Sequence, residues 1–117
     1  MRLTGRKTQA TVSAGHVTIR FISQNILDAS DVAAIVKEIE RALQQHRAQV
    51  VILDFTGVRQ LSSQMFGQLL HLQKAIQGKK GELRLCAMGG NVLKAFKLCR
   101  LDKILPLFAS EDAAVAG

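Results

Sequence analysis

The fold of this chain is decided by two neighbouring stretches, VVILD at residues 50–54 and LSSQMFG at residues 61–67. The first is an unbroken aliphatic run that ends in an aspartate, which is typical of a strand covered on both faces, as in a parallel sheet. The second opens on two serines and continues with apolar residues at three- and four-residue spacing, which predicts a helix over 63–77. Parallel strands present functional groups where they end, so we expect the site of this protein near the two serines.

The rest of the sequence predicts strands that alternate with helices. Residues 10–12 and 17–22 alternate as a hairpin, and residues 31–45 carry apolar side chains along one helical face. Two later strands are expected at 82–88 and at 104–108. Two short helices are expected as well, one capped by Asn91 and one capped by Ser110. We therefore predict an α/β fold, a mostly parallel sheet of four to five strands with an N-terminal antiparallel hairpin strand, covered by about four helices.

Single residues predict where helices and the domain begin and end. Ser30 or Asp31 can cap the first helix, and Gly78 is expected as the left-handed residue that closes the second. Residues 1–8 are basic and polar without periodicity, so we expect a flexible N-terminal arm. Residues 9–117 are then a single domain, because the connections between elements are too short to divide it.

The composition argues against several classes of protein. With 48% hydrophobic residues, the 117-residue chain can build a core without metal or disulfide support, and we expect Cys86 and Cys99 to be reduced core thiols. No apolar run approaches the ~20 residues of a membrane span, and the first residues lack the apolar centre of a secretory signal, so we expect a cytoplasmic protein. No nucleotide or zinc motif is present, and we expect no cofactor, no metal and no stable small-molecule ligand.

The net charge of +7 leaves open a nucleic-acid or acidic-surface binder. Only the basic residues near the C-terminus are close enough to form a stripe, namely Lys94, Lys97, Arg100 and Lys103. The chain has no tryptophan or tyrosine to stack on bases, so we rank nucleic acid below a protein partner.

The serine pair has two interpretations. Ser62 can simply cap the second helix, with Ser63 in its first turn. Alternatively, a phosphate on one of them would be tolerated by the helix dipole and free amides, and its charge would repel a docked partner. No pattern brings a histidine to either serine and no nucleophile elbow is present, so we expect no enzymatic activity.

These residues resemble the STAS domain family, named for sulphate transporters and anti-sigma factor antagonists, from about residue 10 to residue 115. The resemblance is carried by the aliphatic strand ending in Asp54, the turn with Gly57 and the two serines that open a helix. It places Ser63 at the position that the family phosphorylates. Here Ser62 replaces the usual aspartate, Gln64 a serine or threonine, and Met65 a glycine, so Ser62 remains a second candidate for modification.

The resemblance implies a non-enzymatic regulator of bacterial transcription that works by partner switching. An anti-sigma serine kinase of ATPase fold would bind the unmodified protein and phosphorylate it, and a serine phosphatase would reverse the mark. We expect a monomer or a weak dimer. The expected docking face joins the 25–28 turn to residues 59–66, with candidates Asn25, Asp28, Arg59, Gln64, Met65 and Phe66. The alternative within the family is a constitutive accessory subunit of a membrane transporter's ATPase, in which the serines serve only as caps.

Overall fold

The computed structural model describes residues 2–13, 15–46 and 48–117, and its centre is one twisted sheet. The sheet has six strands in the order β1-β2-β3-β5-β7-β8. Their bounds are β1 Arg2–Thr4, β2 Thr8–Ser13, β3 His16–Phe21, β5 Val50–Asp54, β7 Glu82–Cys86 and β8 Leu107–Phe108. The first three strands are antiparallel and the pairs from β3 to β8 are parallel, which confirms the predicted fold class.

The prediction of a flexible arm over residues 1–8 is wrong for the described part of that segment. Arg2–Thr4 form β1, which pairs with β2 and adds one strand to the predicted four or five. The turn between them is held by Glu38, whose carboxylate accepts hydrogen bonds from the backbone N–H of Lys7 (3.0 Å) and of Thr8 (2.9 Å). The Lys7 ammonium also pairs with the Asp31 carboxylate at 2.8 Å. Contacts about thirty residues away therefore order this segment.

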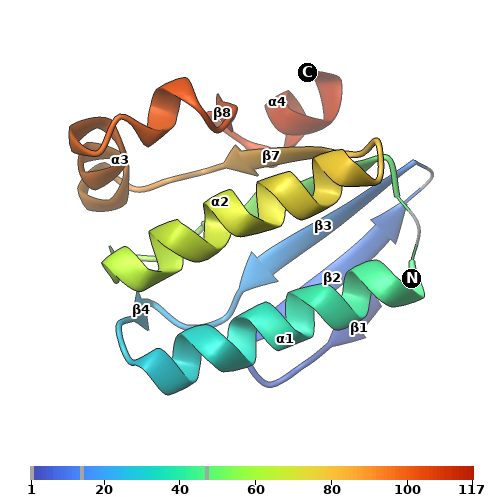
Figure 1. The fold of residues 1–117 in the computed structure, drawn as a ribbon, viewed down its shortest axis with the longest axis horizontal. Helices are drawn as coiled ribbons and strands as arrows, with labels where there is room; N and C mark the ends of the chain where they lie inside the picture. The colour runs from blue at the N-terminus through green and yellow to red at the C-terminus, as the bar shows by residue number, and fades with distance from the viewer. Residues whose placement is uncertain (1, 14, 47) are drawn as a thin grey trace.

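In the described parts of the chain, four helices and one turn of 3-10 helix cover the sheet. They are α1 Ala29–Gln45, α2 Ser63–Gly78, α3 Gly90–Leu98, η1 Leu101–Lys103 and α4 Glu111–Ala116. The long helices α1 and α2 lie side by side over one face of the sheet (Figure 1). Val51 and Leu53 of β5 face their core, whereas Ile52 points the other way and packs with Cys86 and Ala114 under α4. The strand β5 is buried on both faces, as its aliphatic run predicts.

Several helix ends differ from the prediction. The residue before α1 is Asp28, whose side chain makes no capping hydrogen bond, so neither Ser30 nor Asp31 is the cap. Gly78 is still helical, and the left-handed residue after α2 is Lys80, with φ of 63°. Helix α3 begins at Gly90, one residue before Asn91. Ser110 caps α4 as expected, and its hydroxyl oxygen accepts from the Ala113 N–H at 3.1 Å.

The last strand and the cysteines also refine the prediction. The strand expected over 104–108 is reduced to Leu107–Phe108, because η1 and the residues after it occupy the preceding positions, and it lies at the edge of the sheet. Both cysteines are free, but only Cys86 is buried, while Cys99 is exposed. Within the described residues, no helix is both long enough and apolar enough to cross a bilayer.

Candidate functional site

The serine loop and the 25–28 turn are joined by a second, very small sheet. Strand β4 (Asn25–Ile26) runs parallel to β6 (Gln60–Leu61) at the carboxyl end of the main sheet. The backbone N–H of Arg59 donates to the Gln24 carbonyl at 2.7 Å, and that of Ser62 donates to the Ile26 carbonyl at 2.9 Å. These bonds place the two predicted segments of the docking face next to each other, at the end of the molecule where α2 and α3 begin (Figure 1).

The two serines have different structural roles. Ser62 is the N-cap of α2, and its hydroxyl oxygen accepts a hydrogen bond from the Met65 N–H at 3.3 Å. Ser63 is the first residue of the helix and is exposed, and its hydroxyl makes no hydrogen bond to the described residues. The first turn of α2 contains no acidic residue, so no carboxylate of that turn offsets the positive helix end.

Most of the other predicted docking residues lie on the surface, and one does not. Asn25, Asp28, Arg59 and Gln64 are exposed. Met65 has no exposed surface, because it begins the buried row of α2, and its expected place in a partner contact is wrong. The chain therefore cannot present Met65 to a docked protein without opening its core.

Phe66 is half-buried and belongs to a hollow that also involves α3. Its ring meets the Phe96 ring edge to face, with centroids 5.1 Å apart. The hollow measures about 320 Å³ and is lined by Leu27, Arg59, Gln60, Leu61, Phe66, Asn91, Val92 and Ala95. Leu27 is 51% exposed at its rim. Leu27 lies in the 25–28 turn of the expected docking face but was not singled out there. The sequence analysis missed the α3 residues, although α3 follows a parallel strand and so begins at the same sheet edge.

Asp54 holds the turn that leads from β5 towards the serines. Its carboxylate is almost fully buried and accepts hydrogen bonds from the Thr56 N–H at 2.9 Å, from the Thr56 hydroxyl and from the Arg20 guanidinium at 2.9 and 3.1 Å. Burial alone would raise the pKa of Asp54, but the bonds from Thr56 and Arg20 outweigh it and hold this pKa below its usual value. Gly57 completes the turn with φ of 83°, a conformation that favours glycine.

The site offers surfaces for binding and few groups for chemistry. Burial, chiefly, raises the pKa of the Cys86 thiol to about 12, so this sulfur stays protonated at neutral pH. Across the described ranges there is no group of three or more histidine, cysteine or acidic residues that could hold a metal ion. At this end of the molecule the described residues expose the unbonded Ser63 hydroxyl, several polar side chains and a hollow with both apolar and polar lining.

Comparison with known proteins agrees with this architecture. The STAS domain family model matches residues 7–114. An anti-sigma factor antagonist from Mycobacterium paratuberculosis superposes with TM-score 0.82 at 21% identity, over 97% of this chain and 97% of that one. The cell fate determinant SpoIIAA of Bacillus, in its phosphorylated form, superposes with TM-score 0.68 at 23% identity, over 93% of this chain and 96% of that one.

A third similar structure is a sulfate transporter family protein from Wolinella succinogenes, with TM-score 0.72 and 16% identity over 91% of this chain and 86% of that one. These three likenesses establish the fold. Because the family model also spans nearly the whole sequence, from the second strand to the last helix, the chain belongs to the STAS domain family.

Proposed function

We propose that this protein is a non-enzymatic regulator of the anti-sigma factor antagonist kind, in which phosphorylation of Ser63 controls docking to an anti-sigma serine kinase of ATPase fold. The observation that carries the proposal is the exposed, unbonded hydroxyl of Ser63 beside the surface built from residues 25–28 and 59–66. Ser62 already supplies the helix cap, so Ser63 is free for another protein to modify. The similar SpoIIAA structure is a phosphorylated form, which supports phosphorylation of a protein with this fold.

The local electrostatics suit a phosphate at this position. A phosphoserine adds about −1.5 to −2 charges near neutral pH, and the start of a helix favours negative charge through its dipole and free N–H groups. The first turn of α2 contains no acidic residue that would repel it. A phosphate on Ser63 would therefore leave the fold intact while adding charge to the surface where the kinase docks, and a serine phosphatase would restore that surface.

The contact surface in this proposal extends beyond the serine. Asn25, Asp28, Arg59 and Gln64 supply exposed polar groups, and the hollow beside Phe66 can accept an apolar side chain of the partner. A central apolar anchor surrounded by polar groups is the usual anatomy of a protein interface. The protein would act in the bacterial cytoplasm, where the kinase finds its ATP.

The test compares variants of Ser63 in binding and in modification. Against the host's anti-sigma kinases, Ser63→Ala should bind as the unmodified protein does, and Ser63→Asp should lose about 1–3 kcal/mol, or about 5- to 150-fold in Kd. Ser110→Asp is the matched control, because it places the same charge at a capped helix start on the far side of the sheet. With kinase and ATP, the intact mass should gain one phosphate in the parent protein and none in Ser63→Ala. Equal affinity for Ser63→Ala and Ser63→Asp would refute the switch.

The likeness to a sulfate transporter family protein favours one alternative, a constitutive subunit of a membrane transporter's ATPase. In that case the serines act only as caps. The same kinase incubation separates the two functions, because an unchanged intact mass together with copurification of a transporter complex would support the alternative.

A further inference from the structure

The outer face of α3 carries a groove that lies outside the proposed serine surface. The groove measures about 360 Å³ and is lined by Gly90, Leu93, Lys94, Lys97 and Leu98. These positions follow the spacing of one helical face. The opposite face of α3 is anchored in the core by Val92 and Phe96, so the groove faces away from the domain.

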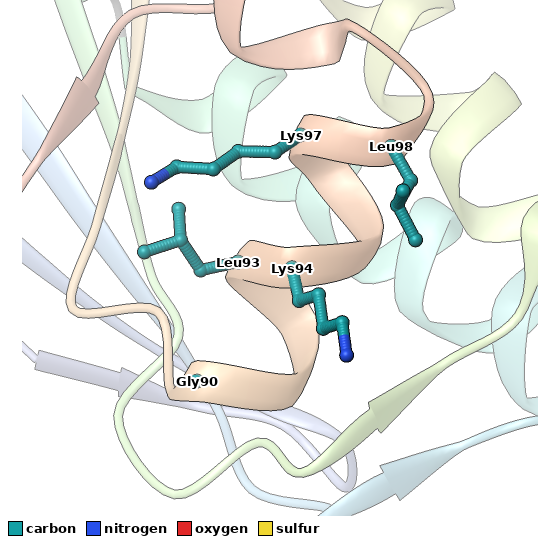
Figure 2. A pocket seen from close by; sticks show the side chains of 5 residues that line it. All are labelled: Gly90, Leu93, Lys94, Lys97 and Leu98. Atoms are coloured by element: carbon teal, nitrogen blue, oxygen red, sulfur yellow. The ribbon is translucent and has the colours of Figure 1, made fainter.

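The side chains that line the groove form two short ridges. Figure 2 shows Leu93 and Lys97 reaching to one side of α3 and Lys94 and Leu98 to the other. Each ridge joins residues four positions apart and contains one leucine and one lysine. Gly90 adds no side chain and leaves one end of the groove open. Ridges at this spacing are the surfaces between which the side chains of a second helix pack.

The groove combines exposed apolar surface with positive charge. Leu98 is 76% exposed, more than any other large hydrophobic residue in the described chain. Lys94 and Lys97 are exposed beside it, and Arg100 and Lys103 follow at once. None of these four cations forms an ion pair with a described residue, and Asp102 is the single acidic residue between positions 90 and 103. A ligand that satisfies this surface has both apolar and acidic groups.

We propose that the outer face of α3 docks an amphipathic helix of a partner protein, with leucine-like residues for the groove and acidic residues for Lys94 and Lys97. Acidic residues of the partner would complement the charge of the exposed lysines, and ridges at this spacing are suited to packing against a helix. A nucleic-acid duplex would leave Leu98 without an apolar partner. A bilayer surface would leave the groove unfilled, and the chain lacks the tryptophan and tyrosine that anchor proteins at membrane interfaces.

The experiment titrates the intact protein with synthetic peptides and follows backbone amide and methyl NMR signals. The test peptide is a helix with leucines along one face and glutamates beside them. Two control peptides accompany it. One has the same composition in a scrambled order, and the other is the same helix with lysines in place of the glutamates. The test peptide should shift the signals of residues 90–98, and both controls should bind at least about ten-fold more weakly.

Variants of the exposed side chains complete the test. The double substitution Lys94→Glu with Lys97→Glu should lower the affinity for the test peptide about ten-fold or more and raise the affinity for the lysine peptide. Leu98→Ala should lower the affinity for the test peptide several-fold. Lys74→Glu with Lys79→Glu makes the same change in net charge at two exposed positions, one in α2 and one directly after it, and should have no effect. The proposal is overturned if the scrambled peptide binds as well, if no peptide binds, or if only duplex DNA or phosphatidylglycerol vesicles shift these signals. None of these readouts involves Ser63, so each proposal can fail without the other.

Discussion

Replacing Asp54 with asparagine tests whether the buried carboxylate holds the turn that leads to the serine loop. One carboxylate oxygen accepts from the Thr56 N–H and hydroxyl, and the other accepts from the Arg20 guanidinium. An asparagine of the same size has one oxygen and one NH2 group, so in either orientation the NH2 group meets a donor. Arg20 is half-exposed and can turn towards water, whereas the Thr56 N–H cannot, so the amide oxygen should face Thr56.

Two effects of Asp54→Asn should lower the free energy of unfolding. One buried amide group is left without an acceptor, and the ionic attraction to Arg20, which solvent partly screens, is removed. Together these should lower the free energy of unfolding by about 2–3 kcal/mol at pH 7. Urea denaturation followed by circular dichroism measures it. Thr56→Val is the matched control, because it removes the hydroxyl donor, keeps the backbone N–H and should cost only about 1 kcal/mol.

The pH dependence gives the same reasoning a second test. The pKa of Asp54 is lower in the folded protein than in the unfolded chain, so its contribution is complete above the unfolded value, near pH 4, and is lost as the pH falls through the folded pKa. The stability gap between parent and Asp54→Asn should therefore be constant near neutral pH and shrink below about pH 4. A loss under about 1 kcal/mol at pH 7, or a gap unchanged in acid, would refute this account of the turn.

Four further substitutions test other parts of the site, each by urea denaturation. Met65→Ala should cost about 3 kcal/mol, because the side chain is fully buried, and a loss below about 1 kcal/mol would contradict its core position. Ser62→Ala should cost about 1 kcal/mol through the lost cap, while Ser63→Ala should cost almost nothing; equal losses would reverse the roles of the serines. Gly57→Ala should cost about 1–2 kcal/mol from the backbone alone, since a Cβ there meets nothing within 4 Å, and a neutral result would exclude the strain.

The elements that were predictable are those whose pattern lies within one segment. The aliphatic run of β5 and the apolar spacings of α1 and α2 depend only on local sequence, and the helices lie within two residues of their expected bounds. Strand β1 was missed because Glu38 anchors its turn across the fold. Strands β4 and β6 have two residues each, too few for any periodicity, so the sheet that builds the site could not be read from a pattern.

The candidate site was predictable as a region but not in every residue. The serines follow a buried parallel strand, and that position alone predicts a functional surface. Met65 was assigned to the surface by its place in the family resemblance, although its spacing with Leu69, Leu72 and Ile76 indicates the buried face of α2. Helical periodicity was the better guide there, because a side chain on that face has no route to solvent. The hollow beside Phe66 needed the packing of α3, which no single segment encodes.

The division of roles between the serines has a consequence for how the proposed switch would work. The cap belongs to Ser62, the turn is fixed by Asp54, and the core of α2 begins at Met65, so each structural task near the loop is performed by a residue other than Ser63. Charge added at Ser63 therefore meets a helix start that favours it and disturbs no buried contact. Stability and docking are then separable, and Ser63→Asp should change the affinity for a partner while its unfolding free energy stays within about 0.5 kcal/mol of the parent.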